Sequence, residues 1–183
     1  MTSAGDDERR AEEFLREIAK PDIEVRDVPL SVCGQEALAA LTSANERARE
    51  ATNLPKLYVR GGEPVRVRHN EDGELTIQEL DVDRMTYELA HAADFIATPA
   101  KGEPKLVFPP REISRYCLSA LGWSFPKLTG VTEVPLFRPD GTLLSAWGYD
   151  EPTGLIYNPP EGLEVDVPDE PDEQQVRAAL DLV

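Results

Sequence analysis

The stretch from Leu57 to Leu80, LYVRGGEPVRVRHNEDGELTIQEL, decides the fold of this 183-residue chain. It contains three short apolar runs, and Gly61-Gly62 separates the first two in a pattern that predicts a β-hairpin with a glycine turn. Asp72-Gly73 is a typical hairpin turn pair before the third run. The stretch therefore predicts a small antiparallel sheet, with strands at residues 57–59, 65–67 and 75–80.

Apolar residues at helical spacing flank this sheet on both sides. From Ala11 to Ile18 they follow the i, i+3, i+4, i+7 pattern of an amphipathic helix, which Pro21 ends. Proline suits the first turn of a helix, so Pro109-Pro110 indicate the start of another. The expected helices cover residues 6–19, 34–50 and 83–95 and a stretch from Pro109-Pro110 to Leu121, and a short strand is expected around Ile23 and Val25.

Residues 130–159 carry turn signals between short apolar runs. The tetrapeptide 138–141 is Arg-Pro-Asp-Gly, with proline and glycine where a tight turn needs them, and a second turn spans 150–154. We expect Asp140 and Asp150 to bond within their own turns. This region predicts a C-terminal β-meander. The whole chain predicts an α+β fold of small antiparallel sheets and hairpins with several packed helices.

Changes in composition suggest four parts. Residues 1–52 form an N-terminal helical segment and residues 53–160 an α+β accessory domain. Residues 161–173 contain seven acids, no base and two prolines, which is typical of a solvated linker. Residues 174–183 begin a further amphipathic helix that stops in mid-pattern, so we expect the chain to be the N-terminal part of a longer polypeptide.

The formal net charge is −16. Such a charge disfavours broad, non-specific binding to nucleic acid or to an anionic membrane, because either contact begins with repulsion. No apolar stretch is long enough for a membrane span, and the polar N-terminus lacks the apolar segment of a secretory signal. We expect a cytoplasmic protein that makes no membrane contact, with Cys33 and Cys117 as buried free thiols.

The sequence contains none of the common catalytic motifs that would indicate an enzyme. Neither phosphate-binding glycine loop occurs, no nucleophile motif is present, and two histidines with two distant cysteines do not make a zinc site. Asp81 and Asp83 are one residue apart, so on a strand they would point the same way and could share a divalent cation. The alternative is that one of them caps the helix that follows. No cofactor is expected in this chain.

Cations gather around the predicted hairpin, in contrast to the rest of the chain. Arg66 and Arg68 alternate with valines, so both should project from one face of the sheet, where they could meet a phosphate backbone while an aromatic ring stacks on a base. The alternative is an exposed polar face paired with local acids. The candidate DNA-binding residues are Lys56, Tyr58, Arg60, Arg66 and Arg68, and Arg111 and Arg115 extend the patch if the fold brings them near.

A fixed order of short motifs occupies roughly residues 50 to 160. It begins with LYVRGG at 57–62 and AADF at 92–95, continues with PPREI at 109–113 and LTGVTEVP at 128–135, and ends with RPDGTLL at 138–144 and GYDEPTGLIY at 148–157. This order resembles the region that precedes the ATPase domain in primase–helicase-like proteins of phages, plasmids and integrated mobile elements. The resemblance implies a parent protein that acts on DNA, with ATP and Mg²⁺ bound by a downstream P-loop domain.

Three functions are compatible with these observations. The first is a non-catalytic accessory domain of a mobile-element replication ATPase, which positions DNA through the basic hairpin. The second is a protein-interaction or oligomerisation scaffold that contacts the same ATPase, other replication proteins or a second copy of itself. The third is a metal-dependent nucleotidyl transferase that uses Asp81 and Asp83.

Overall fold

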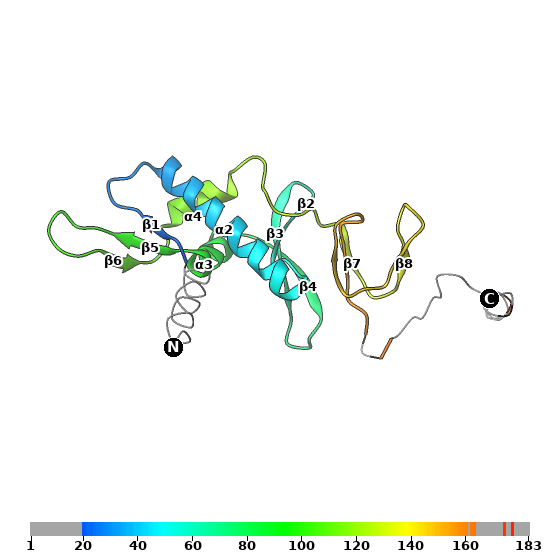
Figure 1. Cartoon of the computed structure of the whole chain (residues 1–183). Coiled ribbons are helices and arrows are strands. Elements are labelled where there is room, and N and C mark those ends of the chain that lie inside the picture. The colour runs from blue at the N-terminus through cyan, green and yellow to red at the C-terminus, as the bar shows by residue number, and fades with distance from the viewer. Residues whose placement is uncertain (1–19, 161, 164–173, 175–176, 178–183) are drawn as a thin grey trace, which may run out of the picture. The chain divides into compact units, whose positions relative to one another are not determined.

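The computed structural model describes residues 20–160, 162–163, 174 and 177. The helix predicted for 6–19 lies outside the described residues, as do most of the acidic segment and most of 174–183. The described chain is α+β, as the sequence predicts (Figure 1). It divides into two units between Thr129 and Gly130, so the boundary expected after residue 52 falls inside the first unit.

Over residues 20–129, the first unit contains two small sheets and three helices. In chain order its elements are β1 (Asp22–Glu24), α2 (Leu30–Thr52), β2 (Leu57–Arg60), β3 (Glu63–His69), β4 (Leu75–Glu79), α3 (Val82–Ala92), β5 (Asp94–Ala97), β6 (Lys105–Val107) and α4 (Arg111–Leu118).

The β2–β3–β4 sheet confirms the antiparallel sheet predicted from 57–80. Its strands pair in sequence order, with Tyr58 opposite Val65 and Arg66 opposite Gln78. Gly61 and Gly62 both have positive φ, 63° and 92°, at the first turn. Residues with a Cβ rarely adopt that conformation, which explains why the tight turn needs glycine there.

The second sheet has the order β1-β5-β6 and was only partly predicted. β1 pairs with β5 in parallel, with Ile23 opposite Phe95, and β6 pairs with β5 in antiparallel fashion. The helix predicted to run to residue 95 therefore ends at Ala92, and β5 begins at Asp94. The helical pattern misled because Ile96 continues the spacing of Met85, Leu89 and Ala92, whereas it lies in β5 opposite Leu106.

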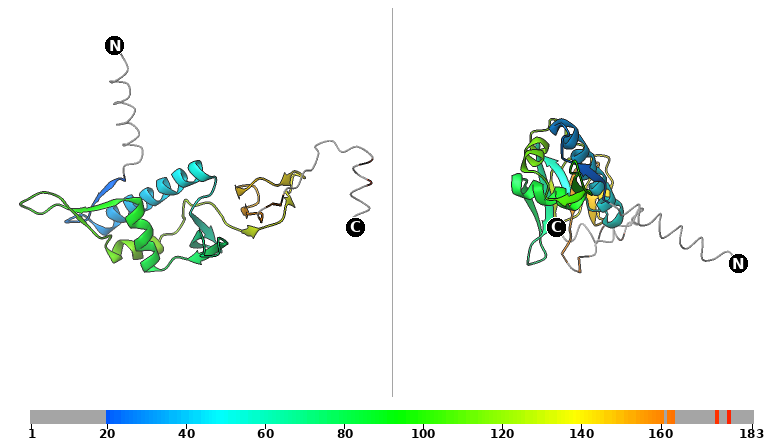
Figure 2. Two further views of the ribbon diagram at one scale, coloured as in Figure 1. Left: turned by 90° about the horizontal axis from the view of Figure 1, so that it is seen from below. Right: turned by 90° about the vertical axis from the view of Figure 1, so that its left-hand side faces the viewer.

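The core of the first unit lies between the three helices and the two sheets, and Figure 2 shows the helices side by side from two further directions. α2 and α4 approach closely at Gly34, where an added Cβ would lie 2.1 Å from Tyr116 Cδ1. The side chains of α2 share this core with β2 and α3, which is why no boundary falls after residue 52. α4 ends at Leu118, so the apolar face predicted to reach Leu121 is too long, and Leu121 is 99% exposed.

The described residues of the second unit form five short strands. They are β7 (Gly130–Thr132), β8 (Leu136–Phe137), β9 (Leu143–Leu144), β10 (Gly148–Asp150) and β11 (Leu155–Tyr157). β8–β9 and β10–β11 are antiparallel hairpins, as a meander requires. β11 also pairs in parallel with β7, which the sequence did not predict because parallel pairing joins strands distant in the chain.

Both predicted turns of this unit are confirmed, and an ion pair joins them. Asp140 Oδ1 accepts from the Thr142 N–H over 2.9 Å, and Asp150 Oδ2 accepts from the Thr153 hydroxyl over 2.7 Å. Arg138 Nε donates to Asp150 Oδ1 over 2.9 Å, and the ion pair brings Arg138 Nη2 to 2.9 Å from the same oxygen. Asp150 therefore links the β8–β9 turn to the β10–β11 turn, beyond the local role predicted for it.

Candidate functional site

The carboxylates of Asp81 and Asp83 lie at the start of α3, and different arginines engage them. Asp81 caps the helix, since its Oδ1 accepts from the Arg84 N–H over 2.8 Å. That backbone hydrogen bond is the main reason why the pKa of Asp81 lies below its ordinary value. Asp83 Oδ1 lies 2.6 Å from Arg111 Nη1. The N-cap alternative is thus confirmed at Asp81, and no group of three His, Cys, Asp or Glu side chains within the described residues could hold a metal ion.

Tyr58 does not offer a stacking surface to a base. The sequence predicts an exposed ring beside the hairpin cations, but the ring is fully buried, with 0% exposure. Tyr58 lies opposite Val65, on the face of the sheet that also contains the buried Val67. The prediction is wrong because the period of two along β2 turns position 58 toward this apolar face.

Arg66 is tied to the interior of the first unit. Its Nη1 donates to Glu88 Oε1 of α3 over 3.0 Å, and its Nε donates to Gln78 of β4 over 3.1 Å. The guanidinium also lies over the Tyr87 ring, 5.7 Å from its centroid. The Arg66 and Glu88 side chains are only 14% and 13% exposed. Arg66 therefore stabilises the contact between sheet and helix and has little surface left for a phosphate.

Arg111 and Arg115 are paired with acids of their own neighbourhood. Arg111 bonds Asp83, as described above, and Arg115 Nη1 lies 3.8 Å from Glu112 Oε1 one turn earlier in α4. These pairs match the alternative in which local acids balance the cations. Pairing with Asp83 places Arg111 at the start of α3 rather than at the hairpin turn.

Three candidate cations remain exposed, namely Lys56, Arg60 and Arg68, and they make no ion pair within the described residues. The register confirms that Arg66 and Arg68 share one face of β3, because they lie opposite Gln78 and Thr76. Arg60 lies opposite Glu63 on the other face. The predicted basic patch is thus divided between two faces of one thin sheet.

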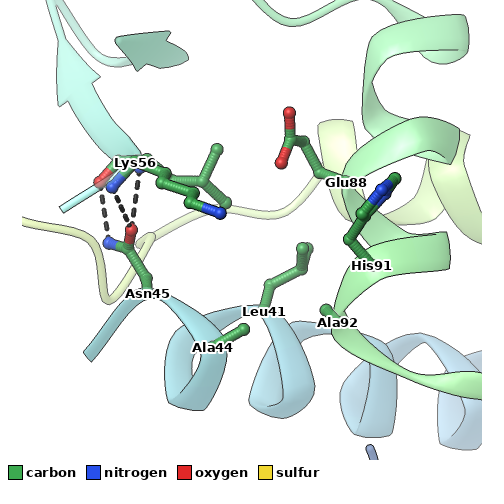
Figure 3. A pocket seen from close by; sticks show the side chains of 8 residues that line it. Leu41, Ala44, Asn45, Lys56, Glu88, His91 and Ala92 are labelled. Carbon is green, nitrogen blue, oxygen red and sulfur yellow. Dashed lines mark hydrogen bonds between the residues drawn. The ribbon is translucent and has the colours of Figure 1, made fainter. Parts of the chain in front are cut away.

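A small pocket of about 60 Å³ opens between α2, α3 and the start of β2 (Figure 3). Lys56, Glu88 and His91 surround its polar side. Glu88 is already bonded to Arg66. The buried Asn45 at its edge accepts from the N–H groups of Lys56 and Leu57 and donates to the Leu57 carbonyl, each over 2.8 Å. This pocket is large enough for water or a small group, and its Asn45 and Glu88 side chains are already bonded within the fold.

Cys33 and Cys117 are buried free thiols, as the sequence predicts. Burial raises the pKa of Cys117 to about 12, and it also raises the pKa of Cys33. A thiol is a nucleophile only as the thiolate, so neither cysteine suits covalent catalysis near neutral pH.

The β5–β6 hairpin presents an apolar surface that the sequence analysis missed. Leu106 is 73% exposed and Phe108 is 92% exposed, and Val107 between them is also exposed. Figure 1 shows this hairpin reaching beyond the helices of its unit. One signal could have revealed it: the run Leu-Val-Phe stands between Lys105 and Pro109-Pro110, too short for a helix and flanked by residues typical of an edge strand.

Neither a membrane-spanning helix nor a related protein identifies a partner for these surfaces. Within the part of the chain that the structure describes, no helix combines the length and the apolar character needed to cross a membrane. The resemblance to primase–helicase-like proteins rests on the order of motifs and stays a prediction. Comparisons of the chain with protein-family models, with curated proteins and with solved structures find no match.

Proposed function

We propose that this chain is a non-catalytic module that binds a protein partner through the β5–β6 hairpin of its first unit. The proposal rests on three consecutive exposed apolar residues. Leu106, Val107 and Phe108 are 73%, 38% and 92% exposed. Exposed apolar side chains along one edge strand lose the free energy of burial until a partner covers them, and such surfaces mark interaction sites. The resemblance stated above supplies the candidate partner, a replication ATPase or a protein that works with it.

The chemistry of the other candidate groups supports a binding role over an enzymatic one. Asp81 and Asp83 bond arginines of the fold, and both thiols are buried with raised pKa values. Free thiols at Cys33 and Cys117 also support a cytoplasmic location as part of the proposal, because reducing compartments keep such groups unpaired.

Site-specific photo-crosslinking in the cells of origin tests the proposal. A photoreactive phenylalanine replaces Phe108 in one version of the full chain and Tyr87 of α3 in the control version. Tyr87 is a suitable control because it is an exposed aromatic residue of the same unit. We expect a discrete crosslinked protein from position 108 and none from position 87. Equal products from both positions, or none from position 108, would contradict the proposal.

DNA positioning remains a second candidate function, because one observation favours it. Lys56, Arg60 and Arg68 are exposed, and no acid within the described residues neutralises them by an ion pair. Three cations could contact phosphates, although the net charge of −16 opposes the approach of DNA.

A further inference from the structure

We propose that the free edge of β6 binds an extended segment of a partner protein as an added strand, in which apolar residues alternate with acidic ones. This inference rests on the proposed function and names its mode and the chemistry of the partner.

The backbone of β6 has an open hydrogen-bonding side. The Asp94 N–H donates to the Pro21 carbonyl over 2.9 Å, and the Ile96 carbonyl accepts from the Val25 N–H over 2.9 Å, so these two residues of β5 face β1. Successive residues of a strand point their backbone groups to opposite sides, so Phe95 and Ala97 face β6.

The register then determines the direction of Leu106. Phe95 lies opposite Val107 and Ala97 lies opposite Lys105, so these are the hydrogen-bonded pairs of the hairpin. The N–H and carbonyl of Leu106 consequently point away from β5. β6 is the last strand of its sheet in the described residues, so both groups are available to an added strand.

On one face of the β6 edge, the exposed side chains favour apolar side chains in the added strand. Phe95 is buried in the core, so the face that contains Leu106 and its opposite residue Ile96 looks away from the helices. An apolar side chain from a strand added next to β6 would cover Leu106 on this face.

On the other face of the β6 edge, the exposed charge favours acidic side chains in the added strand. Lys105 lies one residue from Leu106 and therefore projects to the opposite side, where it is exposed. Lys101 is a second exposed cation, in the connection between β5 and β6. Neither lysine makes an ion pair within the described residues. A strand with a carboxylate opposite Lys105 complements its charge, and the period of two makes the sequence of that strand alternate.

The binding experiment uses the full chain and a short fluorescein-labelled peptide in which valine and glutamate alternate. The control peptide has the same composition, with valines and glutamates in separate blocks. Fluorescence anisotropy should show binding of the alternating peptide and at least about tenfold weaker binding of the control. Hydrogen exchange should slow at the Leu106 amide when the alternating peptide binds. Equal affinity for both peptides, or no change at Leu106, would overturn strand addition.

Two variants separate what the β6 backbone contributes to peptide affinity from what the charge of Lys105 contributes. Leu106→Pro removes the outward N–H, and an edge strand tolerates proline where the N–H faces solvent, so we expect the hairpin to persist and peptide binding to fall about tenfold or more. Lys105→Glu should weaken binding of the glutamate peptide and favour a peptide with lysine in its place. Leu121→Asp and Lys56→Glu are the matched controls, and they should leave the affinity unchanged.

The outcomes distinguish this inference from the function on which it rests. Crosslinks from position 108 without binding of the alternating peptide would leave the protein-binding function standing and overturn strand addition. Failure of the crosslinks at position 108 would count against the proposed function itself, whatever the peptides do.

Discussion

Arg66 Nη1 donates to Glu88 Oε1 over 3.0 Å, and this bond joins β3 to α3 across 22 residues of sequence. We expect Arg66→Ala to lower the free energy of unfolding by about 2 kcal/mol, because Glu88 then keeps a largely buried charge without its partner. Urea unfolding followed by circular dichroism measures the change. The double variant Arg66→Met/Glu88→Met is the control and should recover much of the loss. Unchanged stability in Arg66→Ala would show that the bond contributes nothing.

The DNA-positioning candidate is best tested at residues that the fold does not need. In Arg60→Glu/Arg68→Glu two of the three exposed cations are reversed, while Arg66 is left in place. If the chain binds DNA through this sheet, its affinity should fall, and the slope of log affinity against log salt should decrease by about 2. Fluorescence anisotropy with single-stranded and duplex DNA checks this. Arg111→Glu/Arg115→Glu serves as the comparison, and wild-type affinity in the first variant would remove the candidate.

Gly34 lies where α2 meets α4, and its replacement should be destabilising despite a better helix propensity. Alanine in a helix gains about 1 kcal/mol over glycine. The added Cβ would lie 2.1 Å from Tyr116 Cδ1, however, and overpacking of this kind costs about 1–3 kcal/mol. We expect the thermal unfolding midpoint of the Gly34→Ala variant to be lower than that of the wild type. Adding Tyr116→Ala should make the Gly34→Ala substitution neutral or favourable, and a Gly34→Ala protein more stable than wild type would refute the packing argument.

Asp150 should make the second unit sensitive to acid. Burial, the largest influence, raises its pKa, but hydrogen bonds from Arg138 and Thr153 outweigh burial and hold the pKa below the ordinary 3.8. A carboxyl whose pKa is lowered on folding stabilises the folded state above its unfolded pKa, and this contribution is lost as the pH falls through the folded pKa. Asp150→Asn should therefore be less stable than wild type at neutral pH.

The difference between wild type and Asp150→Asn should then shrink below a pH of about 3.8. Urea unfolding at several pH values, followed through the NMR signals of Tyr149 and Tyr157, measures it. Asp72→Asn, at an exposed turn of the first unit, is the control. A stability difference that stayed constant down to low pH would mean that the charge of Asp150 has no role.

Both cysteines should be nearly inert in the native protein. Cys33 and Cys117 are buried and their thiol pKa values are raised, so little thiolate is present and reagents have poor access. A disulfide reagent such as Ellman's should react slowly with native protein and with both thiols at once in guanidinium chloride. Fast reaction of either thiol in the native state would show that its side of the core opens readily.

Features set by neighbouring residues were predictable from the sequence. The β2–β3–β4 sheet follows from Gly61-Gly62 and Asp72-Gly73, because turn chemistry acts over a few residues. The cap at Asp81 and the bonding of Asp140 and Asp150 within their turns have the same local origin. Such interactions depend little on the rest of the fold.

Features that join distant residues were not predictable. The sequence shows four cations near one hairpin, but not that Glu88 lies within 3.0 Å of Arg66 or that the register places Arg60 on the opposite face. It shows an apolar run at 106–108, but not that β5 lies on only one side of it. The number of partners that a side chain or an edge strand finds depends on topology, which no local pattern specifies.

The parallel pairing of Ile23 with Phe95 has a consequence for dissecting the protein. The last segment of the first unit also returns to its middle, since the Leu128 N–H bonds the Val59 carbonyl over 2.8 Å. Both contacts join residues far apart in the chain, so synthesis must pass residue 128 before the two can form together. A fragment beginning at residue 53 would lack β1 and α2 and leave Leu57, Met85 and Phe95 uncovered. The smallest autonomous piece should thus extend from before Asp22 to at least Leu128.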